Sequence, residues 1–314
     1  MITKEELEYR QSWTLNQKID HSLGVIDQFY QRLNGQVYIS FSGGKDSTVL
    51  LWLARKIYPD IKAVFCNTGN EYPDIVKFVR DKKIRGENIE IIKPKMTPKQ
   101  VIEQYGFPLI SKEKAQKVYY CKMKPNSNVA KIALESKSRY TRLPLCYRYM
   151  IDEKYLVSSF CCDILKKHPL HEYGLKVKKS PIVGTMACES SIRELSYLKT
   201  LCNTFNHRDK RKQKSRPLSI WLEKDIIECI KKNGIPISDI YNKGAARTGC
   251  MFCLFGAQFK DDNRLKLVYE LYPKWYNTFM DYTNNGVTYR EAARIFLSTH
   301  NLYLPDEQPL TLFD

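Results

Sequence analysis

A glycine-rich segment, SGGKDS at 42–47, lies between a run of β-forming residues and a run of helix-forming residues. The preceding residues, QVYISFS at 36–42, favour a strand, and TVLLWLARKIY at 48–58 favours a helix. A glycine-rich turn between a buried strand and a helix N-terminus directs several backbone N–H groups, and the positive end of the helix dipole, at one place. The segment therefore predicts a loop that binds phosphate.

Strands and helices continue to alternate after this loop. Two further strands are predicted at 61–69 and 89–94, and two further helices at 71–86 and 97–106. Thr97 is the expected N-cap of the second of these helices. Repeated alternation of strand and helix implies a mostly parallel sheet with helices on both faces. The predicted fold class is therefore α/β, with a Rossmann-like sheet.

Helical patterns flank this α/β pattern. Apolar residues recur at helical spacing over 3–34, and SPIVGTMA at 180–187 predicts a later strand. A basic polar run, NTFNHRDKRKQKSRP at 203–217, predicts an exposed loop and a boundary. We expect three parts: an N-terminal helical segment over 1–34, a nucleotide-binding domain over 35–217, and a C-terminal helical region over 218–314 that carries a Cys-x-x-Cys loop.

The charge balance favours polyanionic partners. The 314 residues include 51 Lys and Arg against 34 Asp and Glu, a formal net charge of +17. Such an excess attracts polyanions through long-range steering and counterion release, although a lysine-rich proteome would give the same composition. No apolar run approaches the ~20 residues that span a bilayer, and the N-terminal MITKEELEYRQSW lacks the apolar centre of a secretion signal. We expect a cytoplasmic protein with no membrane partner.

The residue types in the glycine-rich loop suit a phosphate chain. Glycines allow close backbone approach, the serine hydroxyls can donate hydrogen bonds, and Lys45 supplies a mobile positive charge. The spacing matches neither G-x-x-x-x-G-K-[ST] nor G-x-G-x-x-G. In its strand-to-helix setting the loop resembles the pyrophosphate loop (PP-loop) of the N-type ATP pyrophosphatases, the adenine nucleotide α-hydrolase superfamily, which cut ATP between the α and β phosphates.

That resemblance implies a HUP-type Rossmann-like fold and a set of site residues. Lys45 and Asp46 would be catalytic, and Asp46 would bind Mg²⁺ or fix the loop. The resemblance places six residues on the pyrophosphate part of ATP: Ser42, Gly43, Gly44, Lys45, Asp46 and Ser47. A glycine-rich turn with incidental polar residues is the alternative reading.

Two later stretches resemble the phosphoadenylylsulfate (PAPS) reductase and adenylylsulfate (APS) reductase family of the same superfamily. NTGNEYPD at 67–74 is similar to D-T-G-x-x-F-P-E, with asparagine at the first position. PIVGTMACESSIRE at 181–194 is similar to G-x-R-x-x-E-S-x-x-R, with Met186 where arginine is usual. The resemblance runs from about residue 36 to 275 and implies that six more residues border the nucleotide: Asn67, Thr68, Gly69, Gly184, Glu189 and Arg193.

Four of the ten cysteines form two close pairs, Cys161 with Cys162 and Cys250 with Cys253. A Cys-x-x-Cys alone fits zinc, a redox dithiol or coincidence. Together, however, SSFCCDILKKHPL and RTGCMFCLFG resemble the iron–sulfur signature of APS reductases. The resemblance implies that the four thiolates bind one [4Fe–4S] cluster, whose charge explains three nearby cations. These cations are Lys166, Lys167 and Arg247.

The other cysteines divide into two groups. Three lie in apolar or periodic settings and are expected to be packing residues: Cys66, Cys202 and Cys229. The roles of Cys121, Cys146 and Cys188 stay open between buried or inert thiols, alternative cluster ligands and sulfur-handling groups. Zinc and unliganded core thiols also stay open for the four paired cysteines.

Two departures from the reductases favour ATP chemistry. Those reductases carry a nucleophilic cysteine in a C-terminal tail, whereas 301–314 contains none, and their phosphate loop lacks the lysine that is present here as Lys45. The sequence thus predicts an enzyme that uses ATP, Mg²⁺ and a [4Fe–4S] cluster to adenylylate an acceptor for sulfur insertion. Sulfur would come from a donor, for which a cysteine desulfurase is one candidate.

Nucleic acid, either DNA or tRNA, is the expected acceptor. Its support is the net charge, the aromatic residues among lysines at 117–124, and the cations of the basic run. Those cations are Arg208, Lys210, Arg211, Lys212, Lys214 and Arg216. Two alternatives stay open: a PAPS or APS reductase that takes its nucleophilic thiol from elsewhere, and a non-catalytic, cluster-bearing subunit that binds nucleic acid.

Overall fold

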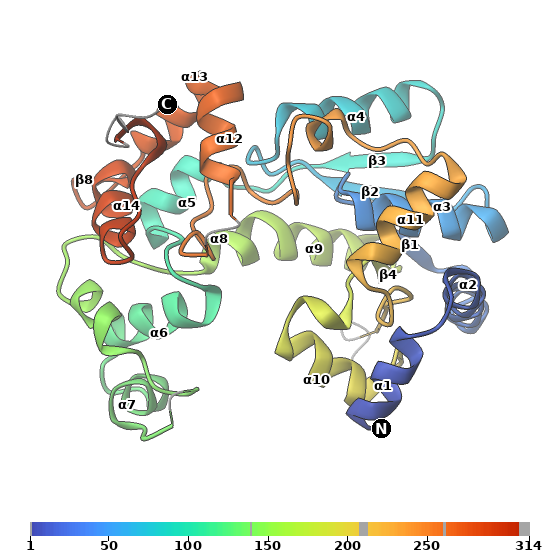
Figure 1. Cartoon of the computed structure of the whole chain (residues 1–314), viewed down its shortest axis with the longest axis horizontal. Coiled ribbons are helices and arrows are strands. Elements are labelled where there is room, and N and C mark those ends of the chain that lie inside the picture. Colours follow the sequence, from blue (N-terminus) through green and yellow to red (C-terminus); the bar gives the residue numbers. More distant parts are fainter. Residues whose placement is uncertain (1, 139, 207–212, 260–261, 308–314) are drawn as a thin grey trace, which may run out of the picture. The chain divides into compact units, whose positions relative to one another are not determined.

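The protein folds into two compact units, each assembled from separate stretches of the chain (Figure 1). The structure, a computed structural model, describes residues 2–138, 140–206, 213–259 and 262–307. The first unit contains 1–67, 73–93 and 169–241, and the second contains 68–72, 94–168 and 242–314. The domain boundaries expected near 34 and 217 both lie inside the first unit, because the chain leaves that unit after its third strand and later returns to it.

The first unit is built on a six-stranded sheet in the order β3-β2-β1-β4-β6-β5. All its pairings are parallel except the one between β5 and β6. The predicted α/β class with a mostly parallel sheet is therefore confirmed. The strands are β1 (Val37–Ser40), β2 (Ala63–Cys66), β3 (Ile89–Ile92), β4 (Ser180–Val183), β5 (Asn203–Thr204) and β6 (Lys214–Ser215).

The basic run at 203–217 differs from its prediction as an exposed loop. Its two ends form β5 and β6, and β6 pairs with β4, so the run adds the last two strands to the sheet. Four of its predicted nucleic-acid contacts, Arg208, Lys210, Arg211 and Lys212, lie outside the described residues.

Helices lie on both faces of this sheet. On one face, α9 packs through Leu170 and Tyr173 against Tyr38 of β1 and Val64 of β2, and α4 lies on the other face (Figure 1). Parallel strands buried on both faces need apolar side chains in both directions, which β1 and β2 supply. The helices of the unit are α1 (Lys4–Gln11), α2 (Leu15–Arg32), α3 (Lys45–Ile57), α4 (Pro73–Ile84), α9 (His168–Val177), α10 (Ser191–Thr200) and α11 (Glu223–Asn233), with short turns η3 (Ala187–Glu189) and η5 (Asp239–Tyr241).

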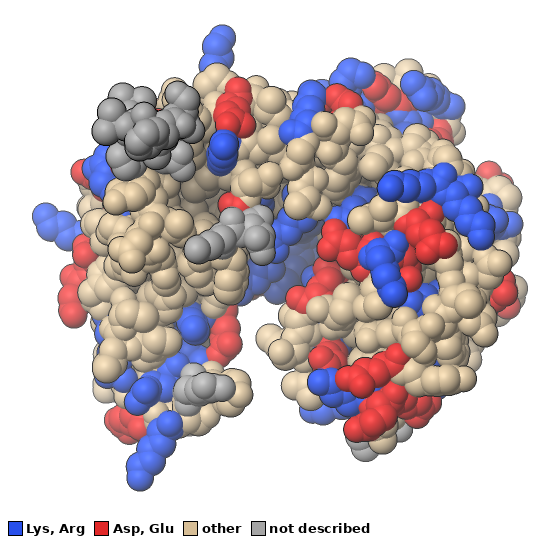
Figure 2. Space-filling model, viewed as in Figure 1, with Lys and Arg blue, Asp and Glu red and all other residues tan. Residues whose placement is uncertain are grey.

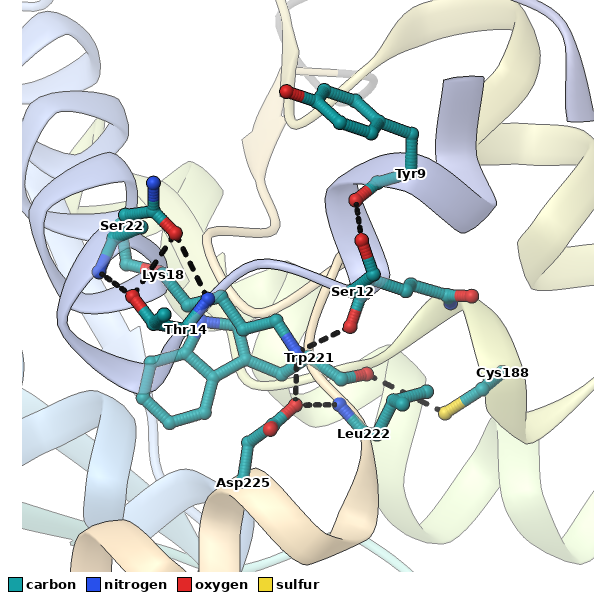
Figure 3. Close-up of polar contacts among 11 residues, drawn as sticks. Tyr9, Ser12, Thr14, Lys18, Ser22, Cys188, Trp221, Leu222 and Asp225 are labelled. Carbon is teal, nitrogen blue, oxygen red and sulfur yellow. Dashed lines mark hydrogen bonds and ion pairs between the residues drawn. The ribbon is translucent and has the colours of Figure 1, made fainter. Parts of the chain in front are cut away.

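The N-terminal helices are anchored to the first unit by buried polar contacts (Figure 3). Lys18 of α2 is fully buried and its Nζ lies 2.6 Å from Oδ2 of Asp225, at the start of α11. The indole N–H of Trp221 donates to Oγ of Ser22 at 2.9 Å, and Ser22 donates in turn to the Pro217 carbonyl at 3.0 Å. The helical segment over 1–34 therefore packs as part of the first unit.

The second unit is largely helical. Thr97 caps α5 as predicted, in a reciprocal capping box with Gln100. The amide of Asn284 donates to the carbonyls of Ile102 and Glu103 at 2.9 Å, which satisfies the end of α5. The elements are α5 (Pro98–Tyr105), α6 (Lys112–Met123), α7 (Asn128–Glu135), η1 (Leu145–Ile151), α8 (Phe160–Cys162), the π-helical η2 (Asp163–Lys167), α12 (Arg264–Leu271), α13 (Pro273–Met280), β7 (Thr283–Asn284), β8 (Val287–Thr288), α14 (Tyr289–Ser298) and η6 (Pro305–Glu307). In the described part of the chain, no helix has both the length and the apolar character that crossing a bilayer requires.

Candidate functional site

The glycine-rich loop lies where the strand order of the sheet reverses direction. β1 is flanked by β2 on one side and by β4 on the other, and both neighbours run parallel to it. The loop at 42–47 follows β1, and Gly184 follows β4, so both lie at the carboxyl ends of adjacent strands. Open α/β sheets bind ligands at this switch point. A Cβ atom on Gly184 would lie 3.2 Å from the Asp46 carbonyl oxygen, so the two segments are in close contact.

The loop holds its own shape through internal hydrogen bonds. The Ser42 N–H donates to Oγ of Ser47 at 3.2 Å, and Ser47 Oγ donates to the Gly44 carbonyl at 3.0 Å. Gly43 has a φ of +73°, and a Cβ there would lie 2.8 Å from Cγ2 of Ile75 on α4. The backbone can thus reach this conformation and pack against α4 only because residue 43 is glycine.

Lys45 opens α3 and is contacted by two residues that the sequence did not single out as site residues. Its Nζ lies 3.0 Å from Oε1 of Glu223, at the start of α11, and 5.6 Å from the centre of the Tyr241 ring. Its backbone N–H donates to the Tyr241 hydroxyl at 2.8 Å. The donor that a phosphate group would use at this helix N-terminus is therefore bonded to a phenol oxygen.

Asp46, within the loop, has a carboxylate oxygen that lacks a hydrogen-bond partner in the described part of the chain. Its Oδ1 is buried and has no hydrogen-bond partner among the described residues. Burial raises the pKa of Asp46 to about 6; Lys45 opposes this shift, while Glu189 and Glu223 add to it. An orphaned carboxylate oxygen fits a hard divalent cation such as Mg²⁺, which prefers oxygen ligands and can take its remaining ones from phosphate and water.

The segment after β4 places Glu189 near the loop, and Arg193 pairs with Glu189. Glu189 Oε2 accepts the Met186 N–H at 2.6 Å, and Glu189 also pairs with Arg193. Met186, at the position where arginine was expected, is almost fully buried. In this structure the predicted Arg193 therefore balances the charge of Glu189.

The segment after β2 divides between the two units. Asn67 ends the strand region, and its N–H donates to the Ile92 carbonyl at 2.9 Å. Thr68 and Gly69 belong to the second unit. Thr68 donates from both its N–H and its hydroxyl to the Glu71 carboxylate at 2.9 Å. The structure thus holds Thr68 in a local turn.

The four paired cysteines come together within the second unit. Cys161 and Cys162 lie in α8, directly before the π-helical turn, and Cys250 and Cys253 lie in a turn closed by the Cys253 N–H donating to the Cys250 carbonyl at 3.2 Å. π-helical turns often occur at functional sites. The thiols are close enough to alter one another's ionisation, and all four are partly exposed.

Neighbouring thiolates raise the pKa values of these thiols, and nearby cations lower them. Burial raises the pKa of Cys250 and of Cys253, and each is raised further by Cys162. A hydrogen bond between the neighbouring thiols raises the pKa of Cys161 and lowers that of Cys162 to about 6. Three cations also favour the Cys162 thiolate, namely Lys112, Lys167 and Lys166. One thiolate is stabilised, and additional thiolates would repel it.

One expected cation has a different role. Lys166 and Lys167 act on Cys162 as expected, but the guanidinium that acts on Cys253 is that of Arg264. Arg247 instead lies 2.9 Å from Oδ2 of Asp262, to which Arg264 is also bonded at 2.5 Å. Arg247 therefore supports the residue that orients Arg264.

The donor set fits a [4Fe–4S] cluster in type and number, because four thiolates are its usual ligands. Within residues 2–138, 140–206, 213–259 and 262–307, no three His, Cys, Asp or Glu side chains are grouped so as to hold a single metal ion. A cluster does not require its ligands to converge on one metal ion, because each thiolate binds a different iron atom. The surrounding cations would offset the negative charge of such a group.

The remaining cysteines are placed individually. Cys66, Cys202 and Cys229 are buried, in agreement with packing roles. Cys121 is also buried, and Cys146 is exposed. Cys188 is exposed, and its Sγ lies 3.5 Å from the Trp221 carbonyl (Figure 3). Burial raises the pKa of Cys188, and Glu189, Glu223 and Asp46 raise it further.

Known proteins are similar to most of this chain. A protein of Methanocaldococcus jannaschii with no assigned function is 27% identical over 274 residues, which cover 83% of this chain and 51% of that protein. The chain thus spans about half the length of this relative. An adenosine 5'-phosphosulfate reductase of Lysinibacillus sphaericus is 26% identical over 247 residues, 77% of this chain and 84% of that enzyme. The crystal structure of a PAPS reductase from Candida auris has a TM-score of 0.44 and 12% identity, covering 80% of this chain and 96% of that one.

The family match covers more of the sequence than any single motif. The phosphoadenosine phosphosulfate reductase domain matches residues 36–254, which include the glycine-rich loop, the Gly184 segment and all four paired cysteines. The expected resemblance to the PAPS and APS reductases is thereby confirmed. The chain belongs to the phosphoadenosine phosphosulfate reductase domain family.

Proposed function

We propose that this protein binds ATP with Mg²⁺, transfers the adenylyl group to an oxygen of an acceptor, and releases pyrophosphate, so that sulfur can replace that oxygen. The observation that carries the proposal is the complete SGGKDS loop at the switch point of the sheet, with Lys45 in the first turn of α3. A family member that only bound an adenylylated substrate would not need a cation for the β and γ phosphates.

The reaction requires stabilisation of charge on the leaving group. The acceptor oxygen attacks the α phosphorus, the bond from that phosphorus to the α–β bridging oxygen breaks, and pyrophosphate leaves with the electron pair. Lys45 and the N–H groups at the start of α3 would stabilise the growing negative charge on pyrophosphate. Asp46, whose buried Oδ1 has no partner among the described residues, would hold Mg²⁺ together with phosphate oxygens, and the ion neutralises phosphate charge when bound.

Sulfur insertion completes the proposed reaction. Sulfur at the sulfide level attacks the acceptor atom that carries the adenylylated oxygen, the bond from that atom to the oxygen breaks, and AMP leaves with the oxygen and the electron pair. A [4Fe–4S] cluster, when bound at Cys161, Cys162, Cys250 and Cys253, would supply or activate the sulfur. Lys112, Lys166, Lys167 and Arg264 would offset its charge. Nucleic acid is the proposed acceptor because of the net charge of +17.

Reduction of a sulfonucleotide is the second candidate, and the APS reductases among the relatives favour it. That reaction needs a nucleophilic thiol. Cys188 is an exposed thiol near the loop carboxylates, but burial and Asp46, Glu189 and Glu223 raise its pKa and so disfavour its thiolate. This electrostatic setting supports the ATP reaction over reduction by Cys188.

Anaerobically purified protein distinguishes the two reactions. We expect pyrophosphate release from ATP in the presence of candidate DNA or tRNA, and no sulfite release from APS. Lys45→Met should abolish pyrophosphate release, whereas Lys77→Met, which removes an exposed lysine of α4, should not. Sulfite release that survives in Lys45→Met would overturn the proposal in favour of the reductase.

A further inference from the structure

A hollow of about 300 Å³ lies along α3 in the first unit, from Thr48 in the first turn to Lys56 near the end of the helix. Its lining combines an indole, several cations and aliphatic side chains. The lining residues used below are Trp52, Arg55, Lys56, Lys82, Glu87 and Pro236. None of them is needed for the reaction proposed above.

The polar groups of this hollow carry an excess of positive charge. Glu87 is the single carboxylate of the lining, and it pairs with both Arg55 and Lys82. Arg55 still has two buried nitrogens, Nε and Nη2, with no hydrogen-bond partner among the described residues. Lys56 lies with its Nζ 4.2 Å from the centre of the Trp52 ring. Three cations thus face one anion, and one guanidinium has unused donors.

A second, shallow hollow of about 630 Å³ lies on the exposed side of α11. Lys224, Lys231 and Lys232 line it together with Glu228 and the exposed side chain of Ile227. α11 packs against α3, and both Lys56 and Lys232 act on the ionisation of Cys229, so the two hollows are neighbours. Figure 2 shows Lys and Arg side chains, beside a group of Asp and Glu, on the face that α11 covers.

We propose that the two hollows form one docking surface for the phosphate backbone of nucleic acid. This inference rests on the proposed function, for which it names the part of the first unit that would hold the acceptor. Six cations spread over two hollows, against two carboxylates, match a chain of regularly spaced phosphates better than they match one small anion. Trp52 and Ile227 add apolar surface on which a base can rest.

The position of the surface separates docking from chemistry. Lys45 and Lys56 lie near opposite ends of α3, and eleven residues of helix correspond to roughly 16 Å. Arg55 and Lys56 would therefore bind the phosphate backbone at the end of α3 away from Lys45, while Thr48 brings the lining of the hollow close to the glycine-rich loop. Contacts at this distance raise affinity for any sequence, and they leave the choice of the modified nucleotide to the reaction site.

Fluorescence anisotropy with a labelled tRNA and a labelled single-stranded DNA tests the surface. The variant Lys56→Gln/Lys231→Gln/Lys232→Gln removes three of its exposed cations. The control Lys4→Gln/Lys99→Gln/Lys266→Gln makes the same change in charge at exposed lysines elsewhere. We expect the first variant to bind about ten-fold more weakly, with the slope of log K against log salt concentration reduced by about 2, and the control to change little.

Three results would overturn the inference: an equal loss of affinity in both triple variants, stronger competition by polyglutamate than by unlabelled tRNA or DNA, or no binding of nucleic acid by the wild-type protein. Pyrophosphate release from ATP, measured on the wild-type protein with the same unlabelled tRNA or DNA present, reports separately on the ATP reaction. Release without nucleic-acid binding would refute the docking surface alone. Surface-dependent binding without release would support the surface and refute the ATP reaction.

Discussion

The glycine-rich loop and the four-cysteine region differ in the interactions of their polar groups. In the loop, Ser42, Gly44 and Ser47 bond to one another, and Lys45 is bonded at both its amide and its side chain. Around the cysteines, each additional thiolate raises the energy of the others. The loop is therefore held by hydrogen bonds of its own and by contacts with other elements of the first unit, whereas the thiols can all ionise together only if positive charge is added between them. Four variants, ordered by expected effect, test this difference.

Cys250→Ser should have the largest effect. Loss of one of four thiolate ligands should remove nearly all cluster iron, sulfide and visible absorbance after anaerobic reconstitution. ATP binding in the first unit should persist. Cys146→Ser is the matched control, since Cys146 is an exposed thiol outside the set of four. Full iron content in Cys250→Ser would contradict the ligand assignment.

Lys18→Met tests whether the two regions are stabilised separately. It would leave Asp225 buried without its cation, which lowers the free energy of unfolding by about 3–5 kcal/mol. We expect the loss in denaturant unfolding monitored at the first unit, with the cluster absorbance of the second unit unchanged below that transition. Lys62→Met, which removes a partly exposed pair with Glu90, should cost about 1 kcal/mol or less. Equal effects of the two variants would show that the buried pair is not important.

Gly43→Ala tests how much of the loop is held by packing. A positive φ costs alanine about 1–2 kcal/mol, and contact with Ile75 adds a further cost of about 1–3 kcal/mol. Gly86→Ala has a φ of +89° but no atom near its added Cβ, so it isolates the backbone cost. In thermal unfolding, the melting temperature of Gly43→Ala should be well below that of Gly86→Ala. Equal melting temperatures would mean that α4 yields to the extra methyl group.

Tyr241→Phe should have the smallest effect, and in the opposite direction. A phosphate must displace the Tyr241 hydroxyl from the Lys45 N–H, so removing that hydroxyl should strengthen pyrophosphate binding by about five-fold, equivalent to one hydrogen bond of about 1 kcal/mol. Isothermal titration with pyrophosphate measures the change, and Tyr9→Phe, at an exposed tyrosine, is the control. Weaker binding would mean that the hydroxyl contacts the ligand instead.

The sheet and the loop could be predicted because their signals are local. β1, α3, β2, α4, β3 and α5 each have a continuous apolar pattern of the right period, and Thr97 marks its helix by its own hydrogen bond. β5 and β6 have two residues each and carry no pattern, so their basic sequence favoured a loop. The sequence also did not indicate that each unit is made of separate stretches of the chain. The residues where the chain passes from one unit to the other carry no pattern that shows it will return.

Long-range partners explain most of what the sequence did not show at the candidate site. Glu223 and Tyr241 contact Lys45 but are far from it in the sequence, and no motif spacing links them to the loop. Arg247 was favoured by its proximity to Cys250 in the sequence, but Asp262 binds it, and Arg264 is the arginine that acts on Cys253. Asp262 pairs with both arginines in the fold, and no local sequence pattern indicates this arrangement.

The buried contacts between α2 and the start of α11 have a practical consequence for work on the nucleotide site. A shortened chain that began at residue 35 would deprive the Asp225 carboxylate of its cation and the Trp221 indole of its acceptor, and would uncover side chains that α2 buries in the full chain. Because α11 also presents Glu223 to Lys45, the disturbance would reach the first turn of α3. The opening 34 residues therefore belong to the first unit and should be kept in any truncation series.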